Sequence, residues 1–192
     1  MRVDRIVVVL AFLLCWPGVA TATQQDELTK FLQPIQEAAD RLTSFSSEFI
    51  QERELALFTE PVIFRGRLTV VRPDRLRWEF VSPAASVLIF SGDSGLRCDA
   101  NGKPISFTLG SDPIMHEVAK QLWLWLGGDY KKLASVYTME RKGENGLILH
   151  PLDTGMAGYI ERVELTFDPV THQPDLVEII EPGGDATRIR FL

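Results

Sequence analysis

Hydrophobic positions along the chain follow two different periods. Between residues 25 and 43 they recur every three or four residues, which predicts an amphipathic helix with Pro34 as a bend or a break. From residue 45 onward apolar and polar residues mostly alternate, and this period of two is typical of half-buried strands. The helical set is Leu28, Phe31, Leu32, Ile35, Ala38, Ala39 and Leu42.

Turn signals separate the strands at the spacing of an antiparallel meander, for example at residues 72–74, 101–102 and 183–185. A second helical stretch interrupts them, between an N-cap with a first-turn proline at 112–113 and two glycines at 127–128. About ten strands and two main helices predict a mainly β, α+β fold. The strands must curl their apolar faces inward and the helices must cover the open side, which leaves a cavity or a closable groove.

Two stretches carry large apolar side chains whose partner the pattern does not identify. The strand at 75–80 turns Leu76, Trp78 and Phe80 to one face, which packs on the protein's own core or on something that the protein carries. Residues 122–126 read Leu-Trp-Leu-Trp-Leu and are apolar all round a helix. They form a buried core segment or one that moves between the core and a ligand. Apolar transfer is worth roughly 25 cal/mol per Å² with either partner, so energetics alone leaves both interpretations open.

The N-terminus has the pattern of an export signal. A basic start and an apolar run over residues 6–15 lead to a small-x-small cleavage site at 20–22. A transmembrane anchor needs roughly 20 apolar residues, about twice this run. A lipoprotein signal needs a small residue before Cys15, where a leucine stands. We therefore expect a cleaved signal peptide over residues 1–22 and a single exported domain over residues 23–192.

Charge and cysteine content narrow the class of protein further. The formal net charge of the chain is −6. Cleavage of residues 1–22 would remove two arginines and one aspartate, and the net charge would become −7. An acidic chain does not suggest nucleic acid or an anionic membrane surface as a partner. Only Cys98 would remain, so no internal disulfide can form. Stability must then come from packing, which favours the periplasm over a disulfide-stapled secreted scaffold.

Motifs that carry catalytic chemistry are missing from the sequence. The three histidines, His116, His150 and His172, are scattered, and no second histidine follows His116 at the spacing of a zinc-protease helix. The sequence contains neither a Gly-x-Ser-x-Gly elbow nor a phosphate-binding glycine loop. We therefore predict no catalytic residue, metal or cofactor, and a protein that is not an enzyme.

The order of elements and several short motifs together resemble a known family. The chain resembles the periplasmic outer-membrane lipoprotein carrier family, LolA, in pattern over nearly all of the expected mature chain and in specific residues over 45–93. The matching features follow the export signal and the first helix. They are Ser-Phe-Ser-Ser-Glu-Phe at 44–49, Gln51, Gly66-x-Leu68, Arg72-Pro73, Trp78, Pro83 and Gly92-Asp93.

The resemblance implies an incomplete, strongly curved antiparallel β-barrel of about ten strands, with helices forming a lid over a hydrophobic cavity. It also implies a carrier that shields the acyl chains of a lipoprotein. The carrier would take its cargo from an inner-membrane ABC transporter and deliver it to an outer-membrane acceptor. We expect a periplasmic monomer that binds no nucleic acid.

The resemblance also suggests which residues form the site. Arg72 matches the arginine of the family's Arg-Pro pair, which is implied to hydrogen-bond the lid backbone and to hold the empty cavity shut. The alternative for Arg72 is a solvated charge beside a turn proline. The predicted lining of the cavity is Phe64, Leu68, Trp78, Phe80, Leu88, Phe90 and Trp125.

Three alternatives to lipoprotein transport stay open. The cargo could be another lipid, such as a glycolipid or a polyene ester. The half-barrel could serve an envelope sensor or interaction module, for which a second domain or a membrane tether is expected. A lipid or glycan hydrolase would need a clustered acid, base or nucleophile in the cavity, for example His116 or His150 beside a carboxylate.

Overall fold

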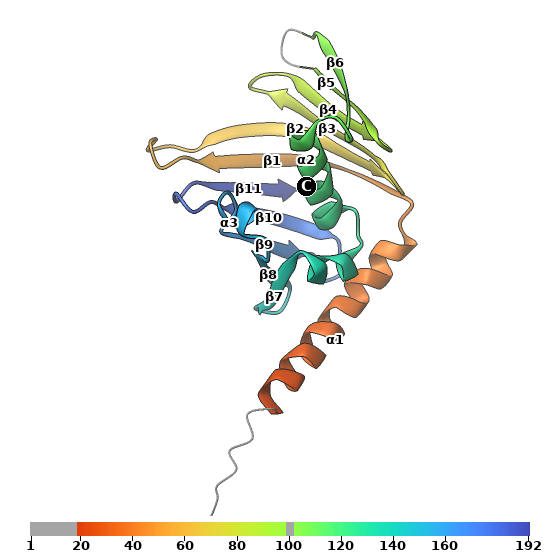
Figure 1. Cartoon of the computed structure of the whole chain (residues 1–192), viewed down its shortest axis with the longest axis vertical. Helices are drawn as coiled ribbons and strands as arrows, with labels where there is room; N and C mark the ends of the chain where they lie inside the picture. Colours follow the sequence, from red (N-terminus) through yellow and green to blue (C-terminus); the bar gives the residue numbers. More distant parts are fainter. Residues whose placement is uncertain (1–18, 99–101) are drawn as a thin grey trace, which may run out of the picture.

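The computed structural model describes the backbone of residues 19–98 and 102–192, and the side chains of residues 26–98 and 102–192. Its centre is a single antiparallel sheet of eleven strands that does not close on itself (Figure 1). This confirms the predicted α+β half-barrel. The strands are β1 (Ser44–Glu54), β2 (Val62–Val71), β3 (Arg75–Ser82), β4 (Ser86–Ser91), β5 (Ser94–Cys98), β6 (Pro104–Thr108), β7 (Tyr137–Lys142), β8 (Gly146–Pro151), β9 (Arg162–Phe167), β10 (Pro174–Ile180) and β11 (Ala186–Phe191).

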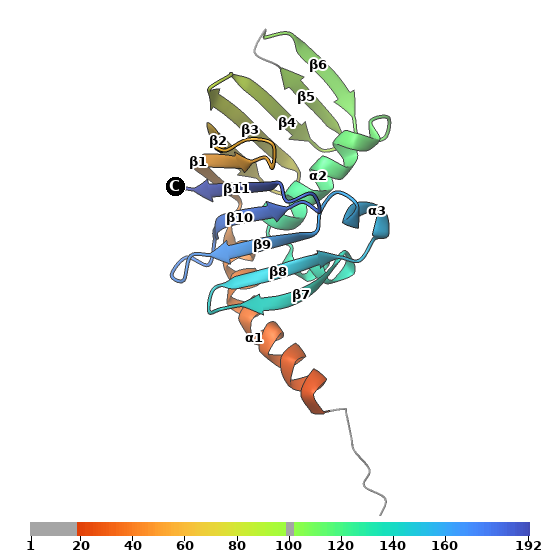
Figure 2. The same cartoon turned by 90° about the vertical axis from the view of Figure 1, so that its left-hand side faces the viewer.

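The strand order shows how two meanders become one sheet. Strands β1 to β6 run outward in sequence on one side, and β7 to β11 return on the other. The two halves join where β11 pairs with β1, with Phe191 opposite Phe49 and Ala186 opposite Glu54. As a consequence, β6 and β7 lie at the two opposite edges of the sheet (Figure 2).

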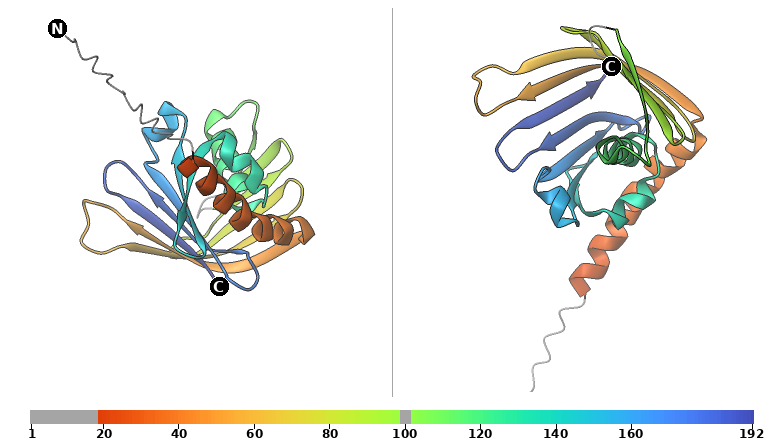
Figure 3. Two further views of the ribbon diagram at one scale, coloured as in Figure 1. Left: turned by 90° about the horizontal axis from the view of Figure 1, so that it is seen from below. Right: turned by 45° about the horizontal axis from the view of Figure 1, so that its top comes forward.

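The helices connect or flank these meanders. They are α1 (Val19–Arg41), α2 (Pro113–Leu126), the 3₁₀ turn η1 (Tyr130–Ser135) and α3 (Thr154–Ala157). The sheet curves around α2, which lies on its concave side (Figure 3). Helix α1 continues through Pro34, so the proline does not break it.

Two predicted features fall wholly or partly outside the described residues. Residues 1–18 of the expected signal peptide lie outside the described residues. The described backbone of α1 begins at Val19, before the expected cleavage site. The predicted turn at 101–102 is described only from Gly102. Cleavage after residue 22 therefore stays a prediction.

Local sequence explains where α2 begins and ends. The Asp112 carboxylate accepts a hydrogen bond from the Met115 backbone N–H at 3.1 Å, and Pro113 occupies the first turn, where its missing N–H is not needed. The helix ends at Leu126 with Gly127 as its C-cap, and Gly128 follows with a positive φ of 79°. A Cβ at Gly128 would also collide with the guanidinium of Arg72, so this glycine is required for close approach as well as for its backbone conformation.

The core of the sheet is an aromatic cluster around Phe49. The ring of Phe49 lies 5.0 Å from that of Trp78 and 5.5 Å from that of Phe80, measured between centroids. Gly66 is the register partner of Phe49 on β2, and its missing side chain makes room for the Phe49 ring. Phe49 is fully buried as a result.

Charged side chains cover the outer surface of the second meander. Glu164 on β9 and Glu178 on β10 are direct register partners, and like charges at such positions repel. Lys142 pairs with both carboxylates, and Arg162 donates to Glu164 at 2.8 Å. Partial burial alone would raise the pKa of Glu164, but the hydrogen bonds from Lys142 and Arg162 lower it below its ordinary value. The carboxylate therefore stays charged, and its charge is balanced by Lys142 and Arg162.

We expect Gly66→Ala to lower the free energy of unfolding by about 2 kcal/mol or more, because the added methyl group would collide with the Glu79 carbonyl and the Phe49 ring. Chemical denaturation followed by tryptophan fluorescence measures the change. Gly183→Ala is the matched control, since a Cβ there meets nothing within 4 Å. Equal stability of the two variants would contradict the packing argument.

Candidate functional site

Two hollows lie beside α2. The larger, which we call the α2–α3 groove, has a volume of about 1030 Å³ and lies between α2, α3 and the segments that flank α3. The smaller, the Arg72 pocket, has a volume of about 340 Å³ and lies at the C-terminal end of α2. Ligand pockets in proteins span roughly 300–1,000 Å³, so the groove is large enough for a sizeable apolar ligand.

The α2–α3 groove is predominantly apolar. Its base includes Trp125, which is buried, and its outer margin includes Ile114, Leu152 and Tyr159, all of them exposed. The polar groups among its lining are few, with Glu117 and Lys120 on the exposed side of α2. The remaining apolar lining is formed by Pro113, Val118, Leu122, Val136, Met156 and Ile160.

A buried polar pair anchors α2 at the base of this groove. The Tyr137 hydroxyl on β7 donates to Oε1 of Gln121, whose Nε2 lies 3.8 Å from the Met156 sulfur. Burial raises the pKa of Tyr137 to about 12, so the phenol keeps its proton at neutral pH and remains a donor. Gln121 thereby links α2 to the sheet on one side and to α3 on the other.

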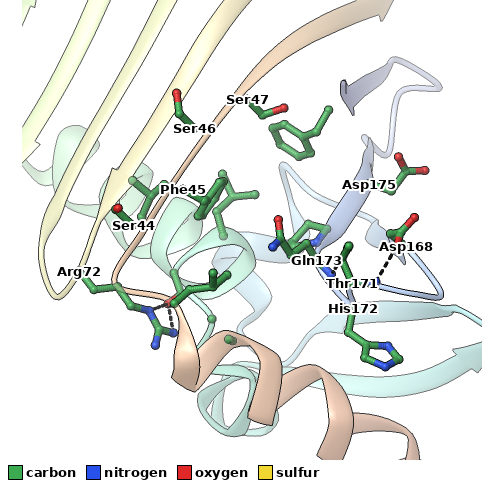
Figure 4. Close-up of a pocket in the computed structure, with 18 of the residues that line it drawn as sticks. Ser44, Phe45, Ser46, Ser47, Arg72, Asp168, Thr171, His172, Gln173 and Asp175 are labelled. Carbon is green, nitrogen blue, oxygen red and sulfur yellow. Dashed lines mark hydrogen bonds between the residues drawn. The ribbon is translucent and has the colours of Figure 1, made fainter.

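Arg72 connects the sheet to the end of α2 (Figure 4). Its backbone N–H donates to the Thr43 carbonyl at 2.9 Å, which fixes the β2–β3 turn next to the end of α1. Its guanidinium donates through Nε to the Gly127 carbonyl at 2.9 Å, and also through Nη2. Gly127 is the C-cap of α2, so this contact reaches one of the carbonyls that the helix leaves without an internal partner.

Gln36 of α1 holds the same segment from the other side. Its Nε2 donates to the Gly128 carbonyl at 2.8 Å, and its Oε1 accepts from the Tyr130 backbone N–H at 3.0 Å. Both hydrogen bonds are buried. Burial also raises the pKa of the neighbouring Tyr130 phenol, which stays neutral. The connection between α2 and η1 is therefore fixed by side chains from β2–β3 and from α1.

The predicted lining residues fall into three groups. Trp125 lines the α2–α3 groove. Phe64, Trp78 and Phe80 belong to the aromatic cluster with Phe49, and the Phe64 and Phe80 rings are 5.6 Å apart. Leu68 and Phe90 are fully buried in the core, and Leu88 packs against it. Except for Trp125, these side chains line neither hollow, and their contact with a ligand stays a prediction.

Sequence reasoning missed three parts of the site. The first is α3, which precedes β9 and is started by the Asp153 carboxylate, which accepts from the Met156 N–H at 2.8 Å. The groove depends on this short helix, because α3 and its flanking segments form one of its walls. Gln36 was also missed, although a lone glutamine beside Ile35 on the apolar side of a helix was an available signal. Nothing in the local pattern of Tyr130 indicated its burial.

Metal and catalytic chemistry find little support in the described part of the chain. Within it, no group of three or more histidine, cysteine, aspartate or glutamate side chains is placed to hold a metal ion. His116 is exposed on α2, and His150 is half-buried on β8. None of the helices within residues 19–98 and 102–192 is both long enough and apolar enough to cross a bilayer.

Fold and site together define a half-barrel protein with an apolar groove beside a covering helix. The family model described as outer membrane lipoprotein carrier protein LolA matches residues 40–192. The chain therefore belongs to the LolA family. A comparison with curated proteins gave no significant match.

Several solved structures are similar to this chain at low sequence identity. The MucA/MucB complex of Pseudomonas aeruginosa contains a chain with 20% identity and a TM-score of 0.50, and the match covers 86% of this chain and 55% of that one. The protein thus spans about half the length of that relative. LppX, a lipoprotein of Mycobacterium tuberculosis, has 10% identity and a TM-score of 0.47, with 87% and 94% coverage. The LolA superfamily protein NE2245 of Nitrosomonas europaea has 11% identity and a TM-score of 0.42, with 85% and 90% coverage.

We expect Gln36→Leu to destabilise the protein by about 2–4 kcal/mol, because it leaves the Gly128 carbonyl and the Tyr130 N–H buried without their partner. Thermal or denaturant unfolding measures this loss. Gln33→Leu, one turn away on the exposed side of α1, is the control and should be nearly neutral. A Gln36 variant as stable as the control would show that these hydrogen bonds do not hold the segment.

Proposed function

We propose that the protein is a periplasmic carrier that shields the acyl chains of lipoproteins, or of a related lipid, between the inner and outer membranes. The observation that carries the proposal is the apolar α2–α3 groove of about 1030 Å³ in a chain of the LolA family. Trp125 at its base and Val118 and Leu122 along α2 offer an apolar wall to hydrocarbon. The function needs no catalytic residue or cofactor.

The proposed mechanism is a competition between acyl chains and the side chains of α2 for the concave face of the sheet. Burying one methylene is worth about 0.8 kcal/mol, so a chain of about 16 carbons would gain on the order of 12 kcal/mol. A site that kept all of this would hold its cargo too tightly for transfer. The packing of α2 in the closed state must therefore offset much of the gain, and a lipid binds by shifting the population towards an open state.

Arg72 is the proposed control on that balance. Its hydrogen bonds to the Gly127 carbonyl exist only while the end of α2 lies beside the β2–β3 turn. They stabilise the closed state and contribute nothing once α2 moves away. The six predicted lining residues on the sheet would then become accessible below α2, whereas Trp125 lies on α2 itself and lines the groove.

The remaining parts of the proposal follow from the family. The donor would be an inner-membrane ABC transporter and the acceptor an outer-membrane protein. Residues 1–22 would be removed on export, and residues 23–192 would act as a monomeric domain. Family membership supports an envelope location, and the acidic net charge of −6 argues against nucleic acid as a partner.

An interaction module is the second candidate. The same fold occurs in the MucA/MucB complex, which is an assembly of two proteins, and this chain covers 55% of the matched chain there. In that case the α2–α3 groove would bind an apolar segment of a partner protein. The two candidates differ in whether free lipid fills the groove.

A fluorescent long-chain fatty acid tests the carrier function directly. We expect saturable, near-stoichiometric uptake by the purified protein, and a loss of about tenfold or more in Val118→Glu, because a carboxylate would be desolvated in the groove. Val170→Glu is the control, since Val170 is exposed on the β9–β10 turn and lies outside the groove. No uptake by the unaltered protein, with circular dichroism showing a folded chain, would reject the carrier and favour the interaction module.

Replacing Arg72 tests the closed-state contact. We expect Arg72→Leu to bind the same fatty acid more tightly, by about tenfold, and to release it more slowly to acceptor vesicles, because the closed state loses hydrogen bonds made by a charged group. Arg75→Leu, which replaces an exposed arginine at the start of β3, should leave both quantities unchanged. Identical affinity and release in the two variants would remove Arg72 from the mechanism.

A further inference from the structure

Exposed hydrophobic side chains gather at one end of the sheet. This end carries the β1–β2 and β10–β11 connections and α3, which lie together in Figure 1 and in the right-hand view of Figure 3, and β3 ends on the same side of the sheet, where Ser82 pairs with Arg65. The register confirms the arrangement, since Glu54 pairs with Ala186, and Ile180 with Ala186 and Arg162. The large exposed side chains here are Leu57, Phe58, Val62, Ile63, Val81, Leu152 and Tyr159.

The β1–β2 hairpin presents the most exposed of them at its tip. Leu57 is 94% exposed and Phe58 64%, and they are adjacent in the chain. The backbone beneath them is partly satisfied, because the Phe58 N–H donates to the Leu55 carbonyl at 2.8 Å and the Ala56 N–H donates to the Asp185 carboxylate at 2.8 Å. Backbone groups that already have partners lower the penalty for entering an apolar phase.

Charged residues at the base of the hairpin are already paired. Arg53 lies 3.5 Å from Glu181, and Glu54 pairs with Arg188. The hairpin thus presents two adjacent apolar side chains at its tip, followed by the polar Thr59 and Glu60, and it has paired charges at its base; such a mixed distribution suits the boundary between headgroups and acyl chains.

The size of the tip favours a bilayer over a protein partner. A stable protein interface buries about 800 Å² on each side, whereas this tip offers two adjacent side chains on a narrow loop. A few apolar side chains are enough for weak, reversible attachment to a membrane interface. The net charge of −6 provides no attraction to an anionic surface, so the contact must be apolar.

We propose that Leu57 and Phe58 insert into the interfacial layer of a phospholipid bilayer and dock this end of the half-barrel on the membrane. Leu152 and Tyr159 at the margin of the α2–α3 groove belong to the same end, so docking brings this margin to the membrane surface. The docking itself is independent of the cargo, whereas its use in lipid transfer rests on the proposed function.

Vesicle flotation tests the docking. The exported protein is used, and its N-terminus is determined by mass spectrometry. It is mixed with phosphatidylcholine vesicles and, separately, with vesicles that contain about 30% phosphatidylglycerol. About one charged lipid in three is enough to produce a surface potential. We expect flotation with both compositions, not strengthened by the anionic lipid and little changed by salt. Leu57→Ser/Phe58→Ser should lower the floated fraction about tenfold or more.

Val170→Ser is the matched control, because Val170 is 83% exposed on the turn at the opposite end of the sheet. It should float like the unaltered protein. Equal flotation of the tip variant and the unaltered protein overturns the proposal, as does flotation of neither. Attachment that requires membrane proteins in the vesicles also overturns it, in favour of a protein partner.

Fatty-acid uptake separates this proposal from the carrier function. The tip variant should take up the fluorescent fatty acid normally, since neither substituted residue lines the groove. Normal uptake with unchanged flotation rejects the docking alone. Flotation that depends on the tip, in a protein that binds no fatty acid, supports the docking and rejects the carrier.

Discussion

The packing of α2 against the concave side of an open sheet is the contact on which the rest of this structure depends. Ten gaps of about 4.8 Å make a sheet of eleven strands about 48 Å wide, whereas a helix of 14 residues is about 21 Å long. One such helix cannot cover the whole apolar surface, even with η1 and the end of α1 beside it. The α2–α3 groove lies between these covering elements, since its lining belongs to α2, to α3 and to the segments 135–136 and 152–160 rather than to the strands.

The two ends of α2 differ in how they are held. At the C-terminal end, Arg72 and Gln36 bind successive backbone carbonyls at Gly127 and Gly128. Towards the N-terminal end, Ile114 is 71% exposed at the margin of the groove. Side-chain hydrogen bonds from β2–β3 and from α1 thus define the position of the C-terminal end.

Much of the fold could be predicted because its signals are local. Alternation located the strands, the Asp112-Pro113 and Gly127-Gly128 pairs bounded α2, and the Arg-Pro pair led to Arg72 beside the end of that helix. The groove could not be predicted, since it joins residues 113–125 to 152–160, and the four residues of α3 are too few to show a helical period. Alternation also shows that Phe64 and Trp78 face the core, but not which part of the core would open to a ligand.

An open sheet has a further consequence at its margins. Within residues 19–98 and 102–192, strands β6 and β7 each leave one row of backbone groups without a neighbouring strand, and such rows can pair with another copy of the chain. Pro104 begins β6 and removes one donor from its row, while Glu140, Arg141 and Lys142 place consecutive charges along β7. The incomplete closure that leaves space inside the half-barrel therefore also creates a risk of self-association. These four residues reduce that risk by making edge-to-edge polymerisation unfavourable at high protein concentration.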